Sequence, residues 1–363
     1  MTIDVDPMFT EMVERAVADE CGFDRVRDWE AATSELHNIW KTFSDLGLLG
    51  IGTPEEVGGS GGELADVVEV IRLAASSALP IPYAEHALLA GQWLVSAGRY
   101  DPALGVVTVV PDPDALTLSG PEGRQILHGT ARRVPWVQQA NRLLVPVRDG
   151  AQHTLLLLDA ADLSVTPGRN IANEPRDTIT ADGFEVPASA FVTSVDPVAW
   201  ALSGAMARAV ALAGAAQRAL DLTIKYVKVR EQFGRPLGKF QAVGHMLALA
   251  AEDTAAARMA SESALAALAR CREDLGWADA LRACENDIAA AKTVASCSAT
   301  TVSRLTHQMH GAMGTTIEYD LQLLTRRLWS WQNEFGSGRV WSERLGRTAI
   351  ARGGAQMWDL ISS

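Results

Sequence analysis

The sequence is poor in cysteine and in basic residues, and it lacks long apolar runs. Its four cysteines contain no CxxC pair, which favours reduced, buried thiols over a disulfide framework or a metal centre. Acidic residues outnumber basic ones by 44 to 32, and the net charge of −12 excludes the basic surface that nucleic acid requires. No apolar run approaches the roughly 18 to 20 residues of a membrane helix. The acidic, amphipathic N-terminus is unlike a secretory signal, so we expect a cytoplasmic protein without a membrane partner.

The pattern of apolar residues changes twice along the 363 residues. Residues 8 to about 100 have helical periodicity, broken by the glycine-rich segment PEEVGGSGG at 54–62. Eight short β-like runs follow between 106 and 192, which is typical of a small sandwich or barrel. After Pro197, long alanine-rich helical segments indicate a bundle. We therefore predict an α+β fold with three domains: an N-terminal helical domain (1–104), a middle small β-barrel or sandwich (105–195) and a C-terminal long-helix bundle (196–363).

The segment from Arg230 to Gln241 is the first that suggests chemistry. Glycine and proline at three of its positions force a turn between two long helices, and Phe233 projects a ring from that turn. Arg230 stands where a planar guanidinium could form two hydrogen bonds to phosphate oxygens. From these residues alone, a plain helix–helix connection with a solvated arginine remains an alternative.

A second segment, residues 308–314, follows a predicted helix. Gly311 and Ala312 are small enough to let backbone amides approach a ligand closely. A simple helix C-cap and turn would explain the same residues. His307 and His310 share a helix face just before this segment, but no cysteine or carboxylate pattern accompanies them, so we expect no metal site.

The two segments together resemble the R-x-x-F-G-x-P-x-x-x-F-Q and Q-x-x-G-G-x-G motifs of the acyl-CoA dehydrogenase family. The resemblance extends to the segments TPEEVGGSGG and TADGFEVPASAF and to the order of domains. In that family the two motifs contact the adenine and pyrophosphate of a FAD whose flavin is held by a neighbouring subunit. The resemblance implies this role for Arg230, Phe233, Gln241, Gln308, Gly311 and Ala312, the last in place of a usual glycine.

The flavin side of the family's site is not matched. Family members carry a T-E-P-x-x-G-S-D loop and a Trp-Ile-Thr strand whose threonine hydrogen-bonds the flavin. Aligned without gaps, this sequence has Arg133 at the aromatic position and Pro135 at the threonine position. Proline has neither a hydroxyl nor a backbone N–H, so two donors to the flavin are lost. Trp136 could compensate only through a shift of strand register.

The catalytic base is also in question, because the family's reaction needs a carboxylate aimed at the substrate's α-carbon. One family position falls on Phe335, with Glu334 one residue early. A slip of one residue on a helix turns a side chain by about 100°, so we expect Glu334 to point elsewhere. A second family position falls at or near Glu285, which is our candidate base. The alternatives are a helix carboxylate paired with Arg282, and a chain that holds no base.

Intact adenine-side motifs beside an altered flavin side resemble the heteromeric acyl-CoA dehydrogenases, in which two homologous chains form an α2β2 assembly. Such enzymes are known from bacterial degradation of steroid side chains and rings. The resemblance implies a companion that holds flavin, thioester and base, α,β-dehydrogenation of an acyl-CoA, and an electron-transfer flavoprotein as acceptor. We interpret a cluster on the final helices as interface packing with solvated cations: Trp329, Trp331 and Trp341 with Arg326, Arg327 and Arg339.

Two alternatives remain at the level of sequence. The first is a self-sufficient homotetramer that uses Glu285 and an unusual flavin pocket. The second is a dehydrogenase-like scaffold that binds an acyl-CoA or another protein without chemistry. Flavin uptake by the isolated chain separates the first alternative from the partner-chain hypothesis.

Overall fold

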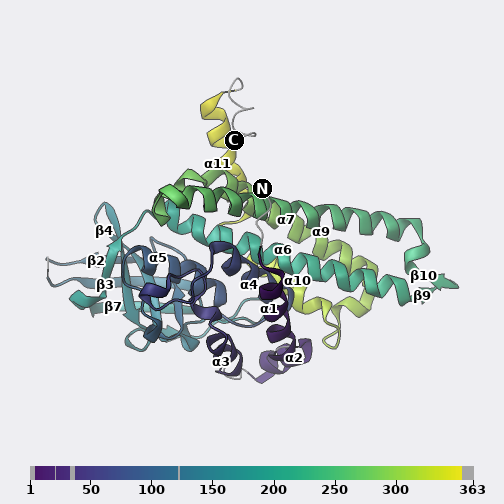
Figure 1. The fold of residues 1–363 in the computed structure, drawn as a ribbon, viewed down its shortest axis with the longest axis horizontal. Helices are drawn as coiled ribbons and strands as arrows, with labels where there is room; N and C mark the ends of the chain where they lie inside the picture. The colour runs from purple at the N-terminus through teal and green to yellow at the C-terminus, as the bar shows by residue number, and fades with distance from the viewer. Residues whose placement is uncertain (1–4, 21, 33–36, 122, 354–363) are drawn as a thin grey trace.

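Helices lie before and after an eight-stranded β-sheet, in the order that the sequence predicts. The protein is described by a computed structural model that covers residues 5–20, 22–32, 37–121 and 123–353. In Figure 1 the strands gather at the left, the purple N-terminal helices lie beside them, and the long green helices extend to the right. This arrangement confirms the α+β class.

The N-terminal region is built from five α-helices and shorter turns. Its elements are α1 (Pro7–Glu20), α2 (Phe23–Ala32), α3 (His37–Asp45), α4 (Leu64–Ser76), a π-helical segment η3 (Ala84–Gly91), α5 (Gln92–Ser96) and 3-10 turns at Leu48–Gly50, Glu55–Val57 and Pro102–Leu104. Glu63 and Asp66 start α4 with reciprocal side-chain caps. The glycine-rich segment forms the predicted loop, in which a Cβ on Gly59 would lie 2.2 Å from the carbonyl oxygen of Thr53. Only glycine fits there.

All eight β-like runs form strands of one sheet. They are β1 (Val107–Val109), β2 (Leu116–Ser119), β3 (Ile126–Pro135), β4 (Arg142–Asp149), β5 (Gln152–Asp159), β6 (Ser164–Thr166), β7 (Arg176–Glu185) and β8 (Phe191–Ser194). The strand order is β6-β7-β3-β2-β4-β5-β8, and β1 pairs with β4 in parallel. The sheet buries a core of its own that includes Leu116, Leu127 and Val145. The middle of the chain is therefore a small β-structure, as predicted.

The C-terminal region is the predicted bundle. Its elements are α6 (Pro197–Val229), β9 (Glu231–Gln232), β10 (Arg235–Pro236), η8 (Leu237–Lys239), α7 (Gln241–Asp274), α8 (Trp277–Ala283), α9 (Glu285–His310), η9 (Gly311–Thr315), α10 (Leu321–Trp331) and α11 (Gly338–Arg352). The segment 276–310, which the sequence suggests as one helix, is broken at Cys284 into α8 and α9. Helices α6, α7 and α9 pack along one another over most of their lengths.

Helix α6 is the centre of the molecule. Asp196 caps its first turn by accepting a hydrogen bond from the backbone of Val198, and Pro197 occupies the first helical position. By length and composition α6 could cross a membrane, so the expectation that no apolar segment is long enough is wrong. However, 89% of its apolar window is buried inside the fold. Small residues allow close packing, and a Cβ on Gly214 would lie 2.4 Å from the Arg72 carbonyl oxygen.

The largest hydrophobic core joins the two helical regions. Trp29 and Phe43 from the N-terminal helices belong to the same cluster as Trp200 and Leu324 from the bundle. The domain boundaries near 104 and 195 coincide with changes of secondary structure. That these boundaries separate three independent domains stays a prediction.

The cysteines are only partly as expected. Cys21 lies outside the described residues. Cys284 is buried and Cys271 half-buried, and their sulfur atoms are 3.3 Å apart. Cys297 is exposed, so the expectation of buried thiols is wrong for that residue.

Candidate functional site

The segment that follows α6 is a tight β-hairpin at the far end of the bundle (Figure 1). Its two turn residues, Phe233 and Gly234, have φ values of 53° and 80°. Two positive φ values are what a two-residue hairpin requires, because only that twist matches the paired strands. A phenylalanine rarely adopts this conformation. The turn leaves 92% of Phe233 exposed, and its ring lies edge-on to that of Phe240 with ring centroids 6.2 Å apart.

The second segment, at the end of α9, lies at the same end of the bundle. Tyr226 of α6 stacks on His310 of α9, with ring centroids 4.2 Å apart. Val227 and Met309 share a small hydrophobic cluster that joins the ends of these helices. Gly311 then ends α9 with a φ of 60°. Two segments about 70 residues apart in sequence thus meet in space.

The side chains that the resemblance singled out form an exposed surface. All six are exposed: Arg230, Phe233, Gln241, Gln308, Gly311 and Ala312. Among the described residues the Arg230 side chain has no ion-pair partner. Large apolar side chains at the same end are also exposed: Val229, Met313 and Ile317. This end of the bundle can therefore receive an anionic ligand and a protein surface together.

A large cleft of about 1020 Å³ lies at the opposite side of the bundle, between the sheet and the last two helices. Pro135 of β3 and Phe335, which follows α10, both line it. The Phe335 ring packs so tightly on α6 that a Cβ on Gly204 would lie 1.9 Å from it. The indole N–H of Trp341 donates to the Phe335 carbonyl oxygen at 2.9 Å. Phe335 is thus fixed against the protein, at the position where the resemblance would place a carboxylate.

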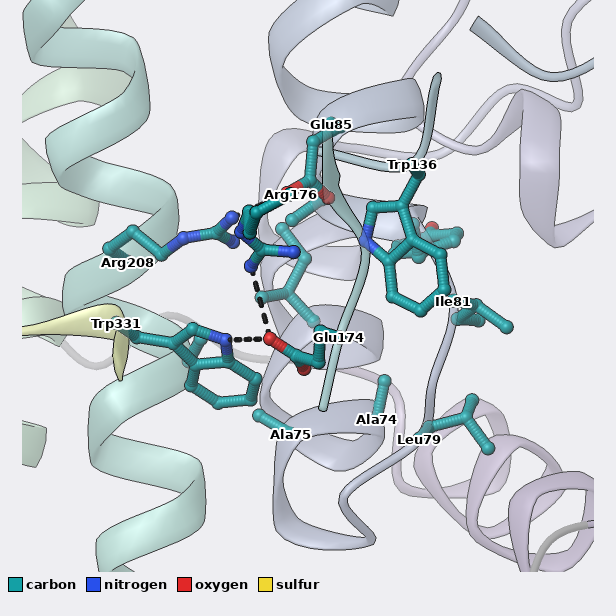
Figure 2. A pocket seen from close by; sticks show the side chains of 14 residues that line it. Ala74, Ala75, Leu79, Ile81, Glu85, Trp136, Glu174, Arg176, Arg208 and Trp331 are labelled. Carbon is teal, nitrogen blue, oxygen red and sulfur yellow. Dashed lines mark hydrogen bonds and ion pairs between the residues drawn. The ribbon is translucent and has the colours of Figure 1, made fainter. Parts of the chain in front are cut away.

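Trp136 does not replace the missing flavin contacts. Its φ of 59° turns the side chain away from the cleft. The indole is buried and lies against Trp29, with ring centroids 5.5 Å apart. It lines a separate, small internal cavity of about 40 Å³, which Figure 2 shows from close by.

Glu334 belongs to a network of charges beside that small cavity. Its carboxylate accepts hydrogen bonds from the guanidinium groups of Arg176 and Arg208, each at 2.7 Å. Arg208 also binds Glu85, and Arg176 also binds Glu174 at 3.0 Å. Figure 2 shows both arginines between these two glutamates. Burial raises the pKa of Glu334, but the two guanidinium groups outweigh burial and lower its pKa to about 2. A carboxylate held this way is a poor proton acceptor. It nevertheless lines the large cleft together with Phe335, so the expectation that Glu334 points elsewhere is wrong.

The network continues into the N-terminal helices, which corrects one interpretation from the sequence. Arg327 is fully buried and forms ion pairs with Glu30 at 3.2 Å and Glu174 at 3.3 Å. The Trp331 indole donates to Glu174 at 2.9 Å. Neither residue is part of solvated interface packing, since each joins α10 to other elements. Arg326 likewise pairs with Glu30. No sequence pattern predicts these pairs, because their members are far apart along the chain.

Glu285 begins α9 and is held by two arginines. Its carboxylate pairs with Arg282 at 2.7 Å and with Arg344 of α11. Arg344 lines the large cleft, whereas Glu285 does not. The pair with Arg282 is the alternative that the sequence suggested. The role of Glu285 as base stays a prediction, and one substitution decides it.

Replacing Glu285 with glutamine in an active assembly is expected to change turnover by less than about threefold, because its ion pairs are partly exposed and hold structure only weakly. Loss of a general base would lower turnover by about 10²- to 10⁴-fold. The measurement is acyl-CoA-dependent reduction of an electron acceptor. Asp287→Asn, on the same helical turn, is the matched control. A hundredfold loss in Glu285→Gln alone would identify Glu285 as the base.

Comparison with known proteins assigns the family. Residues 4–100 match the acyl-CoA dehydrogenase N-terminal domain, and residues 202–349 match the acyl-CoA dehydrogenase C-terminal domain. The chain belongs to the acyl-CoA dehydrogenase family. This family consists of oxidoreductases that use FAD.

The chain is similar to a curated acyl-CoA dehydrogenase, and its fold matches solved structures of two-protein complexes. Acyl-CoA dehydrogenase FadE34 of Mycobacterium tuberculosis is 30% identical over 357 residues, which cover 91% of this chain and 45% of FadE34, so the chain spans about half of that relative. The ChsE4-ChsE5 complex from Mycobacterium tuberculosis matches in fold with a TM-score of 0.87 at 23% identity, covering 97% of this chain and 99% of the other. A Tcur3481-Tcur3483 steroid acyl-CoA dehydrogenase variant matches with a TM-score of 0.82 at 25% identity, covering 96% and 98%.

The residues present fit one end of FAD better than the other. At the end of the bundle, an unpaired guanidinium, an exposed aromatic ring and a turn with small residues suit the pyrophosphate and adenine. In the large cleft, Pro135 offers no donor, and Arg133 stands where the family has an aromatic side chain. The donor set of this chain therefore suits the nucleotide end and not the flavin ring.

Proposed function

We propose that this chain is a cytoplasmic subunit of a heteromeric acyl-CoA dehydrogenase, in which a homologous companion holds the flavin, the thioester and the base. One observation carries the proposal. The family's base position is occupied by Phe335, which is packed on Gly204, and the adjacent Glu334 is fixed by Arg176 and Arg208. Phe335 has no basic group, and the two arginines make the Glu334 carboxylate a poor proton acceptor although it lines the large cleft.

The contribution of this chain would be made at the end of the bundle. Arg230 would bind the pyrophosphate of the companion's FAD, and Phe233 would pack against the adenine, since both side chains are exposed. Gln241, Gln308, Gly311 and Ala312 would complete the contact. When bound, FAD supplies the hydride acceptor for α,β-dehydrogenation of an acyl-CoA, and an electron-transfer flavoprotein would remove the electrons.

The surface around these residues supports a protein partner. Val229, Phe233 and Ile317 are 77%, 92% and 74% exposed, although all three are large apolar residues. Exposed apolar side chains continue along α7 at Leu249 and Met259. Such a surface, next to a nucleotide contact, suits a companion subunit that covers both. Two homologous chains arranged in this way would form an α2β2 assembly.

A solved structure of similar fold supports a substrate class. The Tcur3481-Tcur3483 protein is named a steroid acyl-CoA dehydrogenase. Within the proposal, the companion's site would accept a coenzyme A thioester of a steroid-derived acid. The present chain would not contact the reacting carbons.

Purification separates the proposal from its alternatives. The chain expressed alone should be colourless and inactive, and co-expression with its companion should give a yellow assembly that oxidises an acyl-CoA. The measurements are the flavin absorption spectrum and acyl-CoA-dependent dye reduction. An isolated chain that binds FAD and is reduced by an acyl-CoA would instead be a self-sufficient enzyme. An assembly that takes up no FAD would be a scaffold.

A further inference from the structure

Two cysteines meet where α7 ends and α9 begins. Cys271 lies in the last turn of α7, and Cys284 is the residue between α8 and α9. Their sulfur atoms are 3.3 Å apart, although the whole of α8 lies between them in the chain. A covalent bond between the two sulfur atoms would therefore need only a small movement.

The positions of both cysteines at helix ends allow that movement. The carbonyl oxygen of Cys271 accepts the backbone N–H of Leu275, which ends α7, at 3.0 Å. Cys284 has a φ of −95° and a ψ of 19°, values outside the α-helical region, and the chain changes direction there. Fewer backbone hydrogen bonds are fixed at a helix end than in its interior, so a residue there can shift without disrupting the helix.

The two thiols have different surroundings. Cys284 is 1% exposed and belongs to the main hydrophobic core together with Trp277 and Leu281. Burial, and then its hydrogen bond to Cys271, raises the pKa of the Cys284 thiol to about 12, so this thiol stays protonated and is unreactive by itself. Cys271 is half-buried at the edge of the same core, so a small oxidant in solution reaches it first.

Two thiols in contact could also be part of a metal site. A structural zinc site is closed by four ligands from cysteine, histidine or carboxylate side chains. In the part of the chain that the structure describes, no group of three such side chains lies together. Oxidation is therefore the chemistry that suits this pair without further ligands.

We infer that Cys271 and Cys284 form a reversible disulfide when the chain meets hydrogen peroxide. One peroxide oxygen is transferred to the Cys271 thiol, which becomes a sulfenic acid, and the other leaves as water. The Cys284 sulfur then attacks the sulfenic sulfur. The S–S bond forms, the S–O bond breaks, and the hydroxyl leaves as water with the Cys284 proton. A dithiol reductant returns both thiols by exchange.

The disulfide would close a covalent loop around α8 and tie the end of α7 to the start of α9. The next residue, Glu285, pairs with Arg344 of α11, so the bond would also fix the place where α11 is attached. Gln241 begins α7 and Gln308 lies near the end of α9, so the pair is at the opposite ends of both helices from the proposed FAD contacts. The inference goes beyond the proposed function, because it depends neither on FAD nor on a companion.

Thiol titration of the full-length chain tests the inference. The variant Cys21→Ser/Cys297→Ser retains only the pair, and it is treated with hydrogen peroxide before its free thiols are titrated in denaturant. Both thiols should be lost, and dithiothreitol should restore both. A proteolytic digest without reductant should contain a peptide that joins Cys271 to Cys284 of one chain.

Matched single variants in the same background test the order of the two steps. Cys284→Ala leaves Cys271 without a partner, so its sulfenic acid should be trapped by dimedone. Cys271→Ala leaves only the buried thiol, which should be oxidised at least about tenfold more slowly than the pair. Circular dichroism verifies that each variant is folded. The main test replaces neither cysteine of the pair, so it does not depend on these variants.

Three outcomes would overturn the inference. In the wild-type chain the exposed Cys297 reports whether the oxidant acts, and peroxide that consumes Cys297 while the pair stays reduced is the first. The second is a disulfide between two chains in place of one between Cys271 and Cys284. The third is equally fast oxidation of Cys284 in Cys271→Ala. FAD uptake by the isolated chain would overturn the proposed function, and the thiol titration would still decide this inference.

Discussion

Replacing Arg230 with glutamine in the assembled heteromer should weaken retention of FAD by about ten- to a hundredfold, because a guanidinium fork on the pyrophosphate is lost. Turnover at limiting FAD should fall by the same factor. Fluorescence of the flavin released during gel filtration measures retention, and added FAD should restore turnover. The turn itself should persist, since it is the backbone N–H of Arg230 that binds the Tyr226 carbonyl oxygen.

The control for this result lies two residues away. Lys228 is exposed on the last turn of α6 and carries the same charge. Lys228→Gln therefore removes one positive charge from the same end of the bundle but no predicted phosphate contact. Equal loss of FAD in both variants would mean that FAD is retained by the net positive charge at this end of the bundle and not by a specific contact of Arg230. Normal retention in Arg230→Gln would remove Arg230 from the cofactor site.

Replacing Glu334 with glutamine should destabilise the chain by about 3 kcal/mol at neutral pH, because the buried Arg176 and Arg208 would each lose one of two carboxylate partners and keep only Glu174 and Glu85. The measurement is the free energy of unfolding in urea. Glu343→Gln is the control, since Glu343 is exposed on α11 and forms no ion pair among the described residues. If Glu334 were instead a catalytic base, the substitution would lower turnover and leave stability nearly unchanged.

The same network predicts how stability depends on pH. The folded pKa of Glu334, about 2, lies below its ordinary value of 4.5. The carboxylate therefore contributes its full stabilisation above about pH 4.5 and loses it as the pH falls towards 2. The wild-type chain should lose stability through this window, and Glu334→Gln should lose less. If the free energy of unfolding fell equally with pH in the two proteins, the ion pairs of Glu334 would not contribute to the pH dependence of stability.

The sequence predicts best those elements whose structure depends on residues close together in the chain. The eight strands of the large sheet agree with the eight predicted runs, because each short apolar run is bounded by Asp, Gly or Pro, whereas the two-residue strands β9 and β10 were predicted only as a turn. The long helices were predicted from uninterrupted alanine-rich segments, although the break at Cys284 carries no proline or glycine signal. The π-helical turn at Ala84–Gly91 was also missed, since its composition is that of an ordinary helix.

The rest depends on contacts between distant residues. A β-bulge at Arg132 and Arg133 is set by the pairing of β3 with β7, so an ungapped alignment of β3 could show which residues were unusual but not that both line the large cleft. The ion-pair network has the same origin, because Glu85, Glu174 and Glu334 come from three different regions of the chain. Periodicity within one element cannot reveal such pairs.

The hairpin at Phe233 has a consequence for the cell that makes this protein. The turn, which has positive φ values at Phe233 and Gly234, leaves Phe233 92% exposed in the single chain. Copies of the chain made in excess would display this ring together with Val229 and Ile317. Exposed apolar patches are what aggregation and quality-control proteolysis act on. In the proposed heteromer, this one turn would therefore require matched production of the two subunits, independent of any reaction that the assembly performs.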